Sequence, residues 1–113
     1  MCVENMSIVD QITFDNIHWN DSPISKIEFD FMQNNFVLNF CEFGTRINYQ
    51  LTCQNSIIEK VILDGNIDFT DIEISNVEFE QDGHFRISLY SPENGTLDII
   101  LISDTHQLQK IEE

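Results

Sequence analysis

Apolar residues occupy every second position along much of this chain. In KIEFDF, residues 26–31, three apolar side chains alternate with three charged ones, and RINYQLTC, residues 46–53, places four apolar side chains at alternate positions. Successive side chains of a β-strand point to opposite faces of its sheet, so this period predicts strands with one buried face and one face in water. We therefore expect an all-β, mainly antiparallel protein.

The first of these strands is expected to form a hairpin with the next apolar run, FVLNF. A register that sets Phe31 opposite Phe36 brings the apolar side chains of both strands to one face. It leaves a four-residue turn at residues 32–35.

A second hairpin is predicted in VEFEQDGHFRISL. A three-residue loop that ends at Gly83 sets Phe79 opposite Phe85. The same register sets Glu78 opposite Arg86, so apolar contact and charge favour it together, whereas a two-residue loop would oppose charged to apolar side chains. Gly83 is expected to adopt the left-handed conformation that closes such loops.

Two segments leave the choice of element open. SIIEKVIL, residues 56–63, is apolar on both sides. Its β-branched residues favour a central strand, although a short helix fits the spacing nearly as well. The tail SDTHQLQKIEE, residues 103–113, is either a short strand or a frayed helix.

The whole chain of 113 residues is expected to form a single domain, 1–113, with residues 1–5 and 106–113 as ends that fray. About seven or eight short strands joined by tight turns are the expected content, with one short helix as the open alternative. Such strands build either a sandwich or a curved, partly closed sheet.

The cysteines indicate a reducing compartment. The chain has three of them, Cys2, Cys41 and Cys53, without a CxxC spacing, which gives neither a disulfide framework nor a zinc site. Cys41 and Cys53 lie in strand patterns and are expected to be small buried hydrophobes. The N-terminus lacks a basic, apolar leader, and no run approaches the roughly 18 to 20 residues that span a bilayer. We expect a cytoplasmic protein without a membrane partner.

The charge of the chain is strongly acidic. Its 20 Asp and Glu against 5 Lys and Arg give a formal net charge of −15. A field of this sign repels the phosphates of nucleic acids and attracts basic proteins. The prediction is a basic protein partner and no nucleic acid, with solubility as the alternative role of the charge.

No motif in the sequence predicts catalysis. The histidines His18, His84 and His106 lie far apart in the sequence, and none has a second ligand at metal-site spacing. The stretch DGNIDFTD, residues 64–71, lacks the ligand pattern of a calcium loop. There is no phosphate-binding glycine loop and no nucleophile elbow. We expect a protein that is not an enzyme and binds no cofactor or metal.

The acidic stretch from Asp64 to Asp82 is the first candidate for a binding surface. It contains seven acidic residues and no Lys or Arg. Clustered carboxylates accelerate encounter with a basic partner and bind its arginine and lysine side chains. Glu78 is set aside because the predicted register pairs it with Arg86. The predicted partner-binding residues are Asp64, Asp68, Asp71, Glu73, Glu80 and Asp82.

Trp19, the one tryptophan of the chain, is a further candidate. It stands just before the turn-forming residues Asn20 to Pro23. We interpret it as a plug that closes one end of the sheet, with an exposed aromatic anchor for a partner as the alternative.

The segment HWNDSPISKIEFDFMQNNFVLNF resembles the start of small bacterial β-domains in which a His-Asp-Ser or His-Asp-Ala turn leads into a strand. DGHFRISLYSPENGTLDIILISD resembles their closing hairpin, so the resemblance spans about residues 18–105. In those domains the His and the Asp are adjacent, whereas in this chain Trp19 and Asn20 stand between His18 and Asp21. Some of these domains are immunity proteins of polymorphic toxin systems. The resemblance implies a cytoplasmic inhibitor that binds a basic toxin and occludes its active or substrate-binding surface.

Two other functions stay open at this point. A self-associating structural β-domain would use an exposed sheet edge or an apolar patch. A small-ligand binder would need an enclosed pocket with convergent polar groups. The sequence leaves a monomer and a homodimer equally open.

Overall fold

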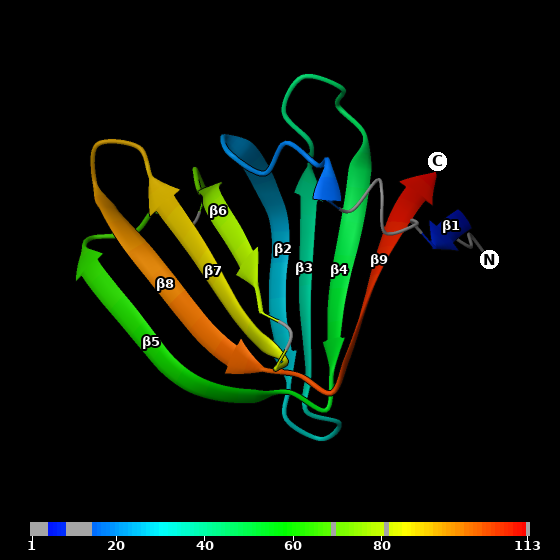
Figure 1. Ribbon diagram of the computed structural model, residues 1–113. Coiled ribbons are helices and arrows are strands. Elements are labelled where there is room, and N and C mark those ends of the chain that lie inside the picture. The colour runs from blue at the N-terminus through cyan, green and yellow to red at the C-terminus, as the bar shows by residue number, and fades with distance from the viewer. Residues whose placement is uncertain (1–4, 9–14, 69, 81, 113) are drawn as a thin grey trace.

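A computed structural model describes residues 5–8, 15–68, 70–80 and 82–112 of the chain. In these residues nine strands form one antiparallel sheet (Figure 1). The all-β, antiparallel prediction is therefore confirmed. The strands are β1 (Asn5–Ile8), β2 (Ser22–Asp30), β3 (Asn35–Cys41), β4 (Asn48–Gln54), β5 (Ile57–Gly65), β6 (Glu73–Phe79), β7 (His84–Ser91), β8 (Gly95–Ile102) and β9 (Thr105–Glu112).

The sheet is open, with β1 and β5 as its two edges. Its strand order is β1-β9-β4-β3-β2-β6-β7-β8-β5. The two halves of the sheet meet at β2, where Ser22 and Pro23 pair with β6 while the remainder of the strand pairs with β3. Figure 1 shows the strands of the two halves fanned out on either side of this junction.

One hydrophobic core draws side chains from both halves, so the sheet curves around it. Alternate residues of β3, β4, β7 and β8 are buried, as their sequence period predicts. Cys53 is fully buried, which raises the pKa of its thiol to about 12, whereas Cys41 is only partly buried. The largest fully buried side chains are Phe36, Phe40, Phe85, Leu38, Leu51, Ile74, Ile87, Leu89 and Leu101.

The hairpin of β6 and β7 has the predicted register. Phe79 pairs with Phe85 and Glu78 with Arg86. Gly83 closes the loop with a φ of 94°, and a Cβ added there would lie 2.8 Å from the carbonyl oxygen of Ser103. Glycine is therefore required both by the left-handed conformation and by the close approach of the neighbouring backbone.

The register predicted for the hairpin of β2 and β3 is wrong. Phe29, not Phe31, faces Phe36, so the four-residue turn is residues 31–34 and the Phe31 side chain is 82% exposed. The Asp30 carboxylate accepts a hydrogen bond of 2.9 Å from the backbone N–H of Met32. This local Asx turn favours the observed register, and a bulge between residues 24 and 26 keeps three apolar pairs by setting Ile24 opposite Phe40.

The segment SIIEKVIL forms a strand, β5, and not a helix, but its predicted central position is wrong. Among the described strands β5 pairs only with β8 and is an edge. Four of its five apolar side chains are exposed, among them Ile57 at 65% and Leu63 at 60%, whereas Ile58 is partly buried against the core. Burial against the described residues therefore explains only part of the apolar character of this strand.

The C-terminal tail is strand β9, which pairs with β4 on one side and with β1 on the other. Of the two alternatives left open for this tail, the strand is the one observed. Across the described ranges, no helix has the length and apolar character needed to cross a membrane.

The turn that precedes β2 is held by buried polar groups. The Ser22 hydroxyl donates to the carbonyl of His18 at 2.8 Å and accepts from the backbone N–H of Phe43 at 3.0 Å. The buried carboxylate of Glu42 accepts from the backbone N–H of His18 at 2.8 Å. Because buried polar groups require partners, these contacts tie the turn to the loop after β3 and give the segment a structural role.

Candidate acidic binding site

The predicted acidic residues lie at two opposite ends of β6 and β7. Asp71 and Glu73 stand at the start of β6, and Glu73 pairs with Tyr90 of β7. Asp64 of β5 lies at the same end, because Thr96 of β8 pairs with Tyr90 on one side and with Asp64 on the other. Strand β6 then runs for 7 residues, or roughly 20 Å at 3.3 Å per residue, before the hairpin loop begins. The six residues therefore do not form one surface.

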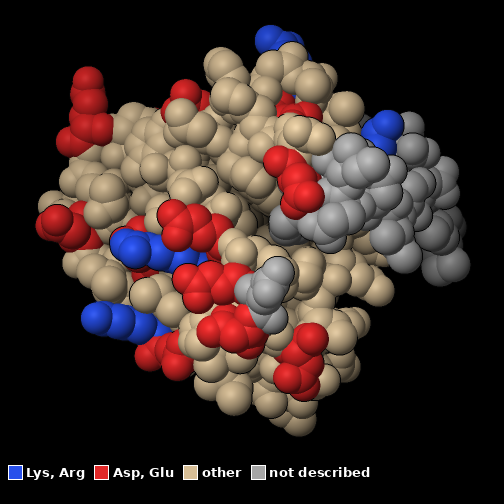
Figure 2. Space-filling view, viewed as in Figure 1, with Lys and Arg blue, Asp and Glu red and all other residues tan. Residues whose placement is uncertain are grey.

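At the hairpin end, Glu80 and Asp82 remain close together beside Glu78. With His84, Arg86 and two apolar residues they line a shallow groove of about 260 Å³ that is open to water. Figure 2 shows acidic side chains gathered on the face over β6, β7 and β8, with basic side chains among them. We call this set, Glu78, Glu80, Asp82 and His84, the hairpin cluster.

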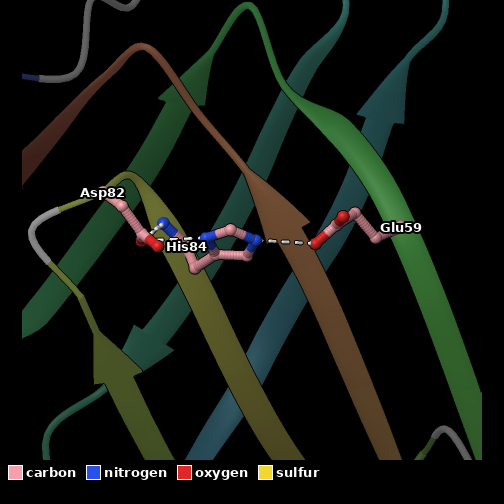
Figure 3. A network of polar contacts seen from close by, with 3 residues as sticks. All are labelled: Glu59, Asp82 and His84. Carbon is pink, nitrogen blue, oxygen red and sulfur yellow. Dashed lines mark hydrogen bonds and ion pairs between the residues drawn. The ribbon is translucent and has the colours of Figure 1, made fainter.

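His84 links the hairpin cluster to the edge strand β5. Its Nε2 lies 2.9 Å from Glu59 Oε1 and its Nδ1 lies 2.8 Å from Asp82 Oδ1 (Figure 3). Both contacts are ion pairs when the imidazole carries its second proton. Glu59 is the extra residue of the bulge in β5, which turns its carboxylate toward the imidazole across β8.

The two carboxylates favour the protonated form of the imidazole. The side-chain contact with Asp82 is the largest cause that raises the pKa of His84, and the charges of Asp82 and Glu59 act in the same direction against a smaller effect of desolvation. In return, the side chain and backbone N–H of His84 lower the pKa of Asp82. The link therefore favours an imidazolium between two carboxylates.

Three members of the hairpin cluster could in principle share a cation. The ligand atoms of Glu80, Asp82 and His84 lie within 4.8 Å of one another. A metal ion, however, binds the neutral imidazole, and here both ring nitrogens face carboxylates that stabilise the proton. The arrangement favours ion pairing within the protein over metal ligation.

Arg86 does not neutralise Glu78, contrary to what the register had implied. Its guanidinium lies 3.0 Å from Asp98 on β8, although Glu78 is its partner across β6 and β7. The Glu78 carboxylate instead accepts a hydrogen bond of 3.1 Å from the side-chain amide of Asn76. Glu78, set aside in the sequence, thus adds a negative charge to the hairpin cluster.

At the other end, two of the predicted residues serve local structure. The Asp68 carboxylate accepts from the hydroxyl and the backbone N–H of Thr70 at 2.6 and 3.0 Å, contacts that lower the pKa of Asp68. The hydroxyl of Tyr90 lies 2.7 Å from the Glu73 carboxylate and also contacts Asp21. These two acidic partners raise the pKa of Tyr90, with the Asp21 contact the larger cause.

Trp19 lies against the core. Its ring is partly buried, and its centroid is 4.9 Å from that of Phe40, which is fully buried. This position agrees with the plug interpretation, and the part of the ring that stays exposed leaves the anchor alternative open.

The contact between Glu59 and His84 was not predictable from either residue alone. The two are far apart in the sequence and lie on strands that do not pair with each other. Only the combined registers bring them together, because Ile102 of β8 pairs with His84 on one side and Ile57 on the other.

The chain matches none of the protein-family models, and no similar curated protein or solved structure was found for it. Function is therefore inferred from the residues of the chain and their geometry.

Proposed function

We propose that this chain is a non-catalytic acidic binding protein whose hairpin cluster receives a basic protein. The single observation that carries the proposal is the open groove at the turn of β6 and β7, with the carboxylates of Glu78, Glu80 and Asp82 around it. The two basic side chains beside it, His84 and Arg86, already face carboxylates of the chain itself. An uncompensated negative surface remains for a partner.

Physical chemistry supports a contact between proteins at this place. The groove is shallow and open, as suits an arginine or lysine side chain that enters with its own surface around it, whereas a small ligand needs an enclosed pocket. The net charge of −15 steers a basic partner toward the chain from a distance. Charge-assisted hydrogen bonds to the carboxylates would then hold the partner.

The resemblance to immunity-type domains supports a finer proposal. In it the chain is a cytoplasmic inhibitor of a basic bacterial toxin. The carboxylates of the hairpin cluster would take the place of a phosphate on the substrate-binding surface of the toxin and exclude the substrate by occlusion. Neither the chemistry of a reaction nor a cofactor is needed for this role.

The test compares two pairs of substitutions of equal charge. Glu78→Gln with Glu80→Gln removes two charges from the hairpin cluster, and Asp64→Asn with Asp71→Asn removes two from the other end. The tagged chain is used to retain a basic protein from lysate of the source organism or its competitors, and the purified partner is then titrated. We expect the first pair to weaken binding about tenfold and the second pair less than about threefold. An equal effect of both pairs would contradict a located site.

A further inference from the structure

We propose that the free edge of β5 pairs with β5 of a second copy of this chain, antiparallel and about a two-fold axis through Ile62. This inference does not depend on the hairpin cluster, because it rests on the edge strand β5, on its apolar side chains and on the charges of Lys60 and Asp64.

The exposed edge is long, apolar and only partly protected. Strand β5 has 9 residues, and Val61 and Leu63 are 55% and 60% exposed. Proteins usually protect such an edge with a bulge, charges or proline, because its unpaired N–H and C=O groups accept another strand. Here a bulge between Ile58 and Lys60 interrupts only the first part. From Lys60 to Gly65 the register with β8 is regular, so this segment keeps the geometry that a further strand needs.

Symmetry restricts how two copies of the segment can pair. In an antiparallel pair of strands, opposed residues alternate between hydrogen-bonded and non-hydrogen-bonded pairs. If the two-fold axis passed between two residues, it would superimpose a hydrogen-bonded pair on the neighbouring non-hydrogen-bonded pair. Pairs related by symmetry must be of the same kind, so this position of the axis is impossible. The axis of a symmetric dimer must therefore pass through a residue that faces its own copy.

Among these registers, the axis at Ile62 matches the charges. It sets Lys60 opposite Asp64 of the second copy, twice by symmetry, and Val61 opposite Leu63 of the second copy. An axis at Val61 would set Lys60 opposite Ile62, an axis at Leu63 would set Ile62 opposite Asp64, and an axis at Lys60 would oppose the two lysines. Opposite charges and apolar pairs directly across a ladder are stabilising, and like charges are not.

The faces of the sheet agree with this register. Val61 and Leu63 pair with Ile99 and Leu97 of β8, which are buried in the core. The two side chains therefore lie on the core side of the sheet, where no other described residue covers them fully. Pairing with a second copy would extend this apolar surface across the axis and bury part of both side chains.

The net charge sets the salt dependence of such a dimer. Each copy carries −15, so the two copies repel each other through the solvent. Salt screens this repulsion and favours the burial of apolar surface. The dimer should therefore strengthen with salt, whereas a complex with a basic protein should weaken.

The first experiment is sedimentation velocity of the full chain from about 5 to about 500 µM at about 0.05 and 0.5 M NaCl. We expect a monomer–dimer equilibrium that shifts toward the dimer at the higher salt. Ile62→Lys places two lysines on the axis and should weaken the dimer about tenfold or more. Ile57→Lys, an equally drastic change on the same strand outside the paired segment, should leave the dimer unchanged. Circular dichroism checks that both variants fold.

A charge reversal tests the register itself. Lys60→Asp opposes two acidic pairs and should weaken the dimer about tenfold, and Lys60→Asp with Asp64→Lys restores opposite charges and should return the dimer to within about threefold of the original. A chain that stays monomeric over the whole range at both salts overturns the proposal. So does a dimer that Ile62→Lys leaves intact or that the double reversal fails to restore.

Discussion

The hairpin cluster and the edge strand β5 are joined by one imidazole, yet they present opposite chemistry to the solvent. The hairpin cluster exposes carboxylates around an open groove, and β5 exposes aliphatic side chains along an edge that no other described strand pairs with. The first surface suits a cationic partner held by charge, and the second suits a strand held by backbone hydrogen bonds and apolar contact. One half of the sheet thus carries both surfaces for which we propose a partner, and solution conditions should separate their binding.

The largest effect is expected from a change that removes the support of both surfaces. Leu101 of β8 is fully buried and pairs with Phe85 of β7 and Ile58 of β5. Leu101→Ala should lower the free energy of unfolding by about 2 to 5 kcal/mol through lost burial and the cavity left behind. Urea unfolding measures this. Ile100→Ala, on the opposite face of the same strand, is the control and should cost less than half as much.

The next effect should be confined to the hairpin cluster. Gly83→Ala forces an alanine into a φ of 94° and brings its Cβ to within 2.8 Å of the Ser103 carbonyl. We expect a loss of about 1 to 3 kcal/mol in the free energy of unfolding. Binding of a basic partner should weaken while self-association through β5 persists. If both weakened in parallel in the folded variant, the two surfaces would not be separable.

Salt should move the two interfaces in opposite directions. Raising NaCl from about 0.05 to 0.5 M shortens the Debye length from about 14 to about 4 Å. Affinity for a basic partner should fall by about tenfold, while the dimer formed through β5 should strengthen. Titration of the partner and sedimentation at matched salt concentrations measure the two responses. A common direction would mean that one kind of interaction governs both surfaces.

The smallest effect concerns the imidazole that joins the two surfaces. The contacts with Asp82 and Glu59 raise the pKa of His84 above its value in the unfolded chain, about 6.5. The stabilisation is therefore fully present below about pH 6.5 and is lost as the pH rises through the folded-state pKa. His84→Gln should lower the free energy of unfolding more at pH 5.5 than at pH 8.5, which lie about one unit below and two units above the pKa of His84 in the unfolded chain.

Thermal unfolding of the original chain and of the His84→Gln variant at the two pH values measures this effect. The quantity compared is the difference in stability between the two proteins at each pH. Burial lowers the pKa of His106 and gives it the opposite pH dependence, but that contribution is common to both chains and cancels in the difference. A variant that is destabilised equally at both pH values would show that the imidazole acts by packing and not by charge.

The sequence predicted the hairpin of β6 and β7 well because three independent features agreed there. Apolar pairs, opposite charges and Gly83 all selected one loop length, and the structure has that register. For β2 and β3 the apolar pattern alone indicated a register. The Asx turn at Asp30 favours the observed one, in which Ile24 makes the third apolar pair and Phe31 remains in water.

Two features of the candidate site could not be read from a one-dimensional pattern. The acidic residues are neighbours in sequence, but β6 is an extended strand that carries them to opposite ends of the sheet. Strand β5 is apolar on both faces, which is typical of a central strand and equally of an edge that another chain covers. Only the order of strands in the sheet separates these two cases.

The position of β9 between β1 and β4 has a consequence for synthesis. Both of these early strands pair with residues 105–112. Because the chain emerges from the ribosome N-terminus first, the edge of β4 that pairs with β9 stays without a partner strand until that late segment is made. Strand β5 likewise precedes β8, its partner among the described strands. Nascent chains on the same messenger RNA would therefore expose the apolar edge of β5 to one another. The bulge at Glu59 and the acidic surface would protect these chains from aggregation before folding is complete.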